Sequence, residues 1–434
     1  MNNIILNNGY FLKEINDRII PFYGNIVIEN GLITAYDKSI TYNNYKVFDL
    51  GGRVVTKPLT NFHEHIYSKL AKGLSINSPM DDFGKILSDY WWKEDLCLTE
   101  ESIYYSTLLT GIESIKNGIG YIFDHHSSPN FISGSLDIIS EAIKYLKLDS
   151  VLCFEVTDRN GEEKKLQSVK ENFDYISKNN ASLKGMIGLH ASFTIDDSTI
   201  KSISELNKDL NAGIHVHICE GEEDATISVE KYGKRPLNRL LEYNLVNEKS
   251  ILAHGVKLQI SELEELKNRN IALAINVDSN LNNFVGIHNF NYLLNNIILL
   301  GSDGMHSNIL KSLKNSFLLS RNSGLTFEKS FNLIKNIHFG SKAFQSKYFN
   351  SDDLNYGGNA NLVVWDYIPP TPVTEENVWG HIIYGLTESR AKHFIKNGKF
   401  LMKDFNLLCV DEDRINSEAK KSALNLYNKF KEIG

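Results

Sequence analysis

The feature that most constrains the fold of this chain is an alternation of short apolar runs with longer amphipathic stretches through its middle. Eight apolar runs predict strands, over residues 53–62, 120–124, 150–156, 185–190, 213–218, 250–253, 271–276 and 296–301. Helical patterns lie between most of them, for example over 136–146, 166–177, 199–210, 236–243 and 261–268. Alternating strands and helices predict a parallel sheet, and eight such units favour an α/β fold of the (β/α)8 type, a TIM barrel. A doubly wound sheet is the alternative, but it would usually carry a glycine-rich phosphate loop after its first strand, and the sequence has none there.

Short strands and turns dominate both ends of the chain. Asn30-Gly31 separates two apolar runs within residues 25–33, which predicts a hairpin, and residues 359–366 and 395–401 predict further strands. Each end is short for a stable sheet of its own. We therefore expect a small discontinuous β-sandwich from residues 1–54 and 351–410, a barrel over 55–350 and a C-terminal helix within 411–434.

Charge and cysteine usage narrow the classes of partner. With 46 Lys and Arg against 53 Asp and Glu, the formal charge is −7. This argues against nucleic acid and anionic membranes, because both prefer a basic face. The first residues show no signal-peptide pattern, and no apolar stretch reaches the ~18–20 residues that span a bilayer. The 4 cysteines are far apart without CxxC spacing, which favours a reducing compartment. We expect a cytoplasmic protein.

Histidines and carboxylates follow the predicted strands. The active sites of (β/α)8 enzymes lie at the carboxyl ends of the strands, and each of the eight runs leads into polar groups. In chain order these are His63, Glu64 and His65; Asp124, His125 and His126; Glu155, Asp158 and Arg159; His190; His215, His217 and Glu220; His254; Asp278, Ser279 and Asn280; and Asp303. Hits at so many equivalent positions predict one functional centre at the mouth of the barrel.

A metal centre is the chemistry that this pattern favours. His63 and His65 are two residues apart on a strand, so both imidazoles project to the same side and can chelate one ion. Zinc takes about four ligands and, in catalytic sites, keeps one position for water. His217 and Asp303 are the natural third and fourth protein ligands. His215 shares the face of His217, and we assign it to the barrel interior behind the ligands.

Other residues suit proton transfer and substrate binding. Glu220 lies three residues beyond His217, where a carboxylate can take a proton from water and deliver it to a substrate. The alternative interpretation is that Glu220 is a solvated loop charge in the acidic run 220–224. His254 can donate a hydrogen bond to developing negative charge. The candidate substrate contacts are His190, His125, Trp92, Arg159 and Asn280, although core packing explains Trp92 and a turn explains Asn280 equally well.

These motifs together resemble the amidohydrolase superfamily. His217-x-x-Glu220, Ala253-His254-Gly255 and Ser302-Asp303-Gly304 are similar to its cytosine/guanine deaminase and chlorohydrolase branch, and residues 124–129 and 153–161 resemble the SsnA-type aminohydrolases within it. The resemblance implies one divalent metal ion per chain, usually zinc with iron or manganese as alternatives, and a homodimer. The metal ligands that it implies are His63, His65, His217 and Asp303; its catalytic residues are Glu220, His254 and Asp303, and His190 lies on the substrate side.

The predicted function is hydrolysis of a carbon–nitrogen bond in a small molecule. We expect hydrolytic deamination of a planar N-heterocycle, such as a purine or pyrimidine, by a hydroxide generated on the metal. A hydrolase of the same fold that opens a cyclic amide or removes chloride is the nearest alternative, because its chemistry at the metal is nearly the same. A non-catalytic scaffold would have eroded ligands, whereas all four ligands and Glu220 are present here.

Overall fold

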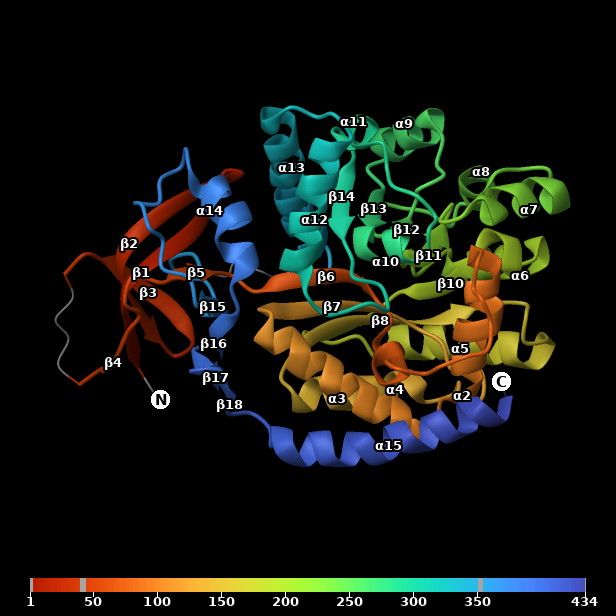
Figure 1. Cartoon of the computed structure of the whole chain (residues 1–434), viewed down its shortest axis with the longest axis horizontal. Helices are drawn as coiled ribbons and strands as arrows, with labels where there is room; N and C mark the ends of the chain where they lie inside the picture. Colours follow the sequence, from red (N-terminus) through yellow and green to blue (C-terminus); the bar gives the residue numbers. More distant parts are fainter. Residues whose placement is uncertain (1–2, 40–43, 350–353, 434) are drawn as a thin grey trace.

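The computed structural model describes residues 3–39, 44–349 and 354–433, and eight parallel strands form its larger domain (Figure 1). They pair in the order in which they follow along the chain, each with the next. The strands are β6 (Leu59–Glu64), β7 (Ile119–His126), β8 (Asp149–Val156), β10 (Ile187–Ala191), β11 (Ile214–Ile218), β12 (Ile251–His254), β13 (Ala272–Ile275) and β14 (Ile297–Leu300). A short ninth strand, β9 (Leu183–Gly185), pairs with β8. The (β/α)8 prediction is confirmed.

The sheet comes close to closing into a barrel between β14 and β6. The backbone N–H groups of Ser302 and Asp303 both donate to the carbonyl oxygen of His63, at 3.0 and 2.9 Å. A parallel bridge joins Glu64 to Asp303. Since the predicted ligands His63 and Asp303 sit on this seam, closure of the barrel itself sets how far apart they lie.

Helices surround the strands. Those that follow successive barrel strands include α3 (Glu100–Lys116), α4 (Ser135–Tyr145), α5 (Glu162–Ser177), α6 (Asp197–Asn207), α7 (Glu222–Tyr232), α8 (Pro236–Glu242), α9 (Ile260–Asn268), α10 (Val277–Asn282), α11 (Phe290–Leu293), α12 (Ile309–Asn322) and α13 (Phe327–Gln345). Helix α3 begins at Thr99, which forms a capping box with Ser102, so two otherwise unpaired N–H groups are satisfied. Between β6 and α3 the chain forms η1 (Ile66–Ala71), α1 (Phe83–Lys85), η2 (Ile86–Trp91) and α2 (Trp92–Cys97).

The two ends of the chain build one mixed sheet beside the barrel (Figure 1). Its strands are β1 (Ile4–Ile15), β2 (Arg18–Glu29), β3 (Leu32–Asp37), β4 (Lys46–Asp49), β5 (Val54–Thr56), β15 (Leu362–Trp365), β16 (Ala391–Lys396), β17 (Lys399–Lys403) and β18 (Asn406–Leu407). The antiparallel pair of β5 with β15 joins the N-terminal strands to the C-terminal ones. A separate sheet domain made from both ends is therefore present, as predicted. The predicted boundary between residues 350 and 351 lies outside the described residues, and the domain bounds stay a prediction.

One predicted strand is two strands in the structure. The run 53–62 divides into β5, which belongs to the sheet domain, and β6, which opens the barrel. Pro58 lies between them and has no N–H to donate to a ladder, so a single strand cannot run through it. The apolar pattern continues across the break because both strands are buried.

The remaining helices are η3 (Ser192–Thr194), after β10; α14 (Val378–Tyr384) and η4 (Leu386–Glu388), between β15 and β16; and α15 (Glu412–Ile433). Helix α15 lies along the outer side of α3, at the bottom of Figure 1, and also contacts α2 and η1. It agrees with the helix predicted near the C-terminus. None of the helices in the described part of the chain is long and apolar enough to cross a membrane.

Candidate active site

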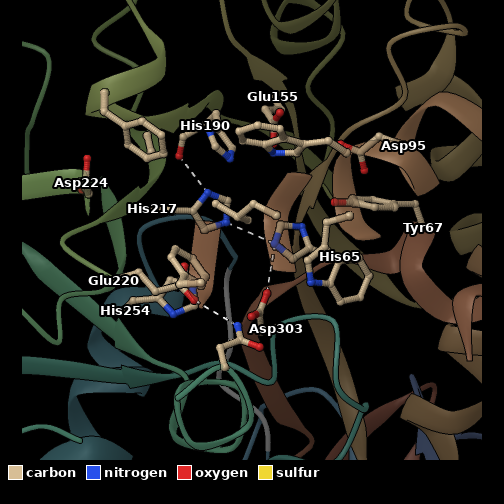
Figure 2. A pocket seen from close by; sticks show the side chains of 17 residues that line it. His65, Tyr67, Asp95, Glu155, His190, His217, Glu220, Asp224, His254 and Asp303 are labelled. Atoms are coloured by element: carbon tan, nitrogen blue, oxygen red, sulfur yellow. Dashed lines mark hydrogen bonds and ion pairs between the residues drawn. The ribbon is translucent and has the colours of Figure 1, made fainter. Parts of the chain in front are cut away.

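The polar strand ends meet in a cavity at the carboxyl edge of the barrel (Figure 2). Of the predicted ligands, His65, His217 and Asp303 face this cavity, and His63 lies fully buried directly behind them. Glu220 and His254 line it as well. The complete lining is His65, Tyr67, Phe83, Leu87, Trp91, Trp92, Asp95, Glu155, His190, Ala191, Phe193, His217, Glu220, Asp224, His254, Asn283 and Asp303.

Two of the imidazoles are held so that bare nitrogens face each other. His65 Nδ1 lies 2.6 Å from the carbonyl oxygen of His125, and His217 Nδ1 lies 2.8 Å from that of His190. A carbonyl oxygen only accepts hydrogen bonds, so both Nδ1 atoms carry protons, and in the neutral imidazoles both Nε2 atoms present lone pairs. These Nε2 atoms are 3.2 Å apart (Figure 2). Two lone pairs at this distance require a positive charge beside them, either a proton or a metal ion.

Asp303 supplies the negative charge of the cluster. Its Oδ1 lies 3.0 Å from His65 Nε2 and 3.4 Å from His63 Nε2, and its Oδ2 accepts from the hydroxyl of Ser279 at 2.5 Å. Burial alone would raise the pKa of Asp303, but the two imidazoles hold it well below its ordinary value. Burial alone would lower the pKa of His65, but the neighbouring Asp303 raises it to about 9. The cluster therefore favours a bound cation.

His63 lies at the floor of the site, and its Nε2 faces Asp303. Its Nδ1 lies 2.8 Å from His215 Nε2, and its own Nε2 has no hydrogen-bond partner among the described residues. The side chains of both residues are buried. The structure therefore brings together His63, His65, His217 and Asp303, and it places His215 behind the cluster. Glu64, between the two histidines, points away from it and accepts from Asn61 Nδ2 at 2.7 Å.

The backbone is strained where the strands end. Cys219, His254 and Asp303 have φ values of 48°, 71° and 53°, and they follow or end β11, β12 and β14. A left-handed conformation is costly for residues other than glycine, and such residues cluster at functional sites. Here each one turns the chain sharply, so that a strand-end side chain faces the cavity.

Glu220 and His254 form a second polar pair beside the cluster. Glu220 Oε2 lies 3.4 Å from His254 Nε2, and Glu220 Oε1 accepts from Asn283 Nδ2 at 3.3 Å. His254 Nδ1 lies 2.9 Å from Asn280 Oδ1, which leaves its Nε2 facing the glutamate. Burial raises the pKa of Glu220, against the opposing effect of His254. Glu220 is thus not a solvated loop charge but a buried carboxyl inclined to hold a proton.

The candidate substrate contacts divide into two groups. His190 and Trp92 line the cavity, with ring centroids 6.3 Å apart. Arg159, Asn280 and His125 do not line it. Arg159 pairs with Glu155 at 2.6 Å and stacks on the ring of Trp92 at 4.3 Å, because its side chain turns back against its own strand end.

Asn280 and His125 are placed differently from what a substrate contact requires. Asn280 stands behind His254 and fixes the orientation of that imidazole. His125 is fully buried beneath His65 and His217, so a ligand in the cavity does not reach it. Sequence position showed that His125 lies at the end of one barrel strand and that Asn280 follows another, but not how deep each side chain lies in the barrel.

Several lining residues do not directly follow a predicted strand, so they were not identified from the sequence. Tyr67, Phe83, Leu87 and Asp95 come from the connection between β6 and α3, and Phe193 follows β10. Asp95 accepts from the hydroxyl of Ser127 at 3.1 Å through Oδ2, whereas its buried Oδ1 has no hydrogen-bond partner among the residues that the structure describes. Apart from His65, which directly follows β6, only Trp92 of this connection was among the predicted site residues, because a long connection between elements gives no periodicity that shows which side chains turn inward.

Comparison with known proteins agrees with this geometry. The model of the Amidohydrolase family matches residues 58–401. A protein of Methanococcus maripaludis named 5'-deoxyadenosine deaminase is 28% identical over 422 residues, covering 93% of this chain and 96% of that protein. An adenosine deaminase of Xanthomonas campestris, solved with bound zinc, superposes with a TM-score of 0.80 at 16% identity, over 98% of this chain and 99% of that one.

A second solved protein shares the same architecture. The zinc complex of atrazine chlorohydrolase from Arthrobacter aurescens gives a TM-score of 0.81 at 16% identity, over 97% of this chain and 100% of that one. Identities this low show a common fold and no more. The family match is of a different kind, since it runs through all eight barrel strands and into the second half of the sheet domain. This chain belongs to the amidohydrolase family.

Proposed function

We propose that this protein is a metal-dependent aminohydrolase that removes an amino group from a planar nitrogen heterocycle. The observation that carries the proposal is the pair of facing lone pairs on His65 and His217, next to an ionised Asp303 and a buried Glu220. An arrangement of this kind has little use without a cation, and a buried carboxyl with a raised pKa beside it is suited to proton transfer during hydrolysis.

The residues present fit one divalent metal ion. His63, His65, His217 and Asp303 would hold it, and the atoms of His63, His65 and Asp303 lie within 4.8 Å of one another. Three imidazoles and one carboxylate suit zinc first, with iron and manganese as alternatives. The Nδ1 atoms of His65 and His217 donate to backbone carbonyl oxygens. Metal-binding histidines normally make such a bond with the nitrogen that does not bind the metal. A metal held there would lower the pKa of a water molecule so that it attacks the ring carbon.

The protein's own groups would move the protons. Asp303 is ionised and accepts a proton from the attacking water, while Glu220 delivers a proton to the ring nitrogen next to the attacked carbon. His254, whose Nδ1 donates to Asn280 Oδ1, would in its doubly protonated form donate from Nε2 and stabilise the negative charge that develops on the oxygen at that carbon. Asp303 would then return its proton to the amino group, which leaves as ammonia when the carbon–nitrogen bond breaks. Glu220 would recover a proton from the hydroxyl on the ring carbon, so that this carbon retains the oxygen of water as a carbonyl.

The walls of the cavity support a flat aromatic substrate. Phe83, Trp91, Trp92 and Phe193 line it, and rings of this kind pack against a planar heterocycle in stacked or edge-on geometry. Two of the three relatives named above act on adenine nucleosides according to their names, so 6-aminopurine nucleosides are the first class to test. We include in the proposal that the enzyme acts in the cytoplasm as a homodimer, without a nucleic-acid partner.

The experiment is an ammonia-release screen on the zinc-loaded and the chelator-treated protein, with aminopurine nucleosides, aminopyrimidines and pterins as substrates. We expect ammonia only from the zinc-loaded protein. The variant His63→Ala should lose both zinc and activity, whereas His381→Ala, in α14 of the sheet domain, should retain both. Hydrolysis that opens a ring or releases chloride without ammonia would refute the deaminase assignment.

A further inference from the structure

We propose that His125 supplies a further imidazole to the metal centre through its Nδ1 atom, so that His65, His125 and His217 form a three-imidazole face of the site. The inference rests on the metal site of the proposed function. It adds a ligand from β7, a strand that the four expected ligands do not use.

The hydrogen bonding of His125 leaves a bare lone pair in a dry place. Its Nε2 lies 3.0 Å from the carbonyl oxygen of Leu189, and since a carbonyl only accepts, the proton is on Nε2. Nδ1 therefore presents a lone pair. That atom is buried and has no hydrogen-bond partner among the described residues. A buried acceptor without a partner is unfavourable, and a metal ion would satisfy it.

A ring nitrogen of His125 lies in the same cluster as two expected ligands. Ligating atoms of His65, His125 and His217 all lie within 4.8 Å of one another, and the rings of His125 and His217 have centroids 4.6 Å apart. Nitrogens bound to one zinc ion at ~2.0–2.1 Å are at most about 4 Å apart, so a small contraction completes the set. His125 also accepts the proton of His65 Nδ1 at its backbone carbonyl, so it already positions one ligand.

The neighbouring histidine shows that this placement is specific. His126 follows on the same strand and faces the opposite way, with Nε2 2.8 Å from the hydroxyl of Ser128. Its ring packs against Tyr67 and Phe154. It belongs to none of the groups of three ligating atoms in the described part of the chain. His126 is as buried as His125, so it provides a matched control.

The test uses the full chain stripped of metal. Zn²⁺ affinity is measured by competition with a chromophoric chelator, and the visible spectrum of the Co²⁺-loaded protein reports its coordination. The variant His125→Phe keeps the ring and removes the lone pair. We expect it to bind Zn²⁺ at least about 10-fold more weakly and to change the Co²⁺ spectrum, whereas His126→Phe stays within about 2-fold. Wild-type affinity and spectrum in His125→Phe would overturn the inference.

A second measurement decides the matter if His125→Phe does not fold. X-ray absorption of the zinc-loaded wild type should count four imidazoles around the metal, from His63, His65, His125 and His217; a count of three overturns the inference. The two proposals fail in different ways. Zinc bound by three imidazoles and a carboxylate removes only the role of His125, whereas a wild type that binds no zinc in this cluster removes the proposed function as well.

Discussion

Gly301 lets the barrel close against His63. Replacing it should displace this metal ligand, although Gly301 itself is not a ligand. The residue follows β14, directly before Ser302 and Asp303, whose N–H groups bond to the His63 carbonyl. A Cβ atom built on Gly301 would lie 2.1 Å from Asn276 Oδ1 and 2.6 Å from His63 Cβ. The Asn276 side chain can rotate. His63 Cβ belongs to a barrel strand and must retreat by about 0.8 Å to reach the 3.4 Å of an ordinary contact.

The expected consequence of Gly301→Ala has two parts. Overpacking of this kind costs about 1–3 kcal/mol of unfolding free energy, so the unfolding temperature of the metal-free protein should fall. Displacing one ligand should weaken Zn²⁺ binding by about 10–100-fold, as the loss of a group that orients a ligand does. Differential scanning calorimetry and chelator competition measure the two effects.

The matched control is Gly380→Ala, in α14, where a Cβ atom would meet nothing within 4 Å. Alanine in a helix is more favourable than glycine by roughly 0.5–1 kcal/mol, so this variant should be as stable as the wild type or slightly more stable. Its zinc affinity should not change. If Gly301→Ala unfolds at the wild-type temperature and binds zinc with wild-type affinity, the reasoning about the seam is wrong.

Two further predictions concern carboxylates. Glu220→Gln should lower kcat by about 10²–10⁴-fold while zinc stays bound, and Glu222→Gln, an exposed neighbour with a side chain 73% accessible, should leave kcat unchanged. Glu14 joins the two domains: burial would raise its pKa, but His338 and Lys57 hold it well below its ordinary value. A lowered folded-state pKa means that the carboxylate contributes stability above the unfolded pKa of about 4.3 and loses it as the pH falls. Thermal unfolding should therefore show Glu14→Gln less stable than the wild type at pH 7, with the difference shrinking below about pH 4; a constant difference would contradict this.

The sequence determined the barrel strands and the chemistry at their ends. All eight predicted strands are present, because a short buried strand needs only a local apolar run between turn signals. The prediction that His63 and His65 project to the same side followed from the two-residue period of a strand, which does not depend on the rest of the fold. Local rules of this kind act within a few residues, so they are legible in the sequence.

Tertiary structure decided how deep each polar group lies and which atoms it presents. His125 was predicted to contact substrate but lies beneath the cluster, and Asp95 was not predicted but reaches the cavity from a connecting helix. The protons of His65 and His217 are fixed by carbonyl oxygens on neighbouring strands, those of His125 and His190. In a neutral histidine, the hydrogen-bond acceptor at one ring nitrogen determines that the other nitrogen presents the lone pair. In this protein that acceptor lies on another strand, so the metal-binding geometry exists only once the barrel has closed.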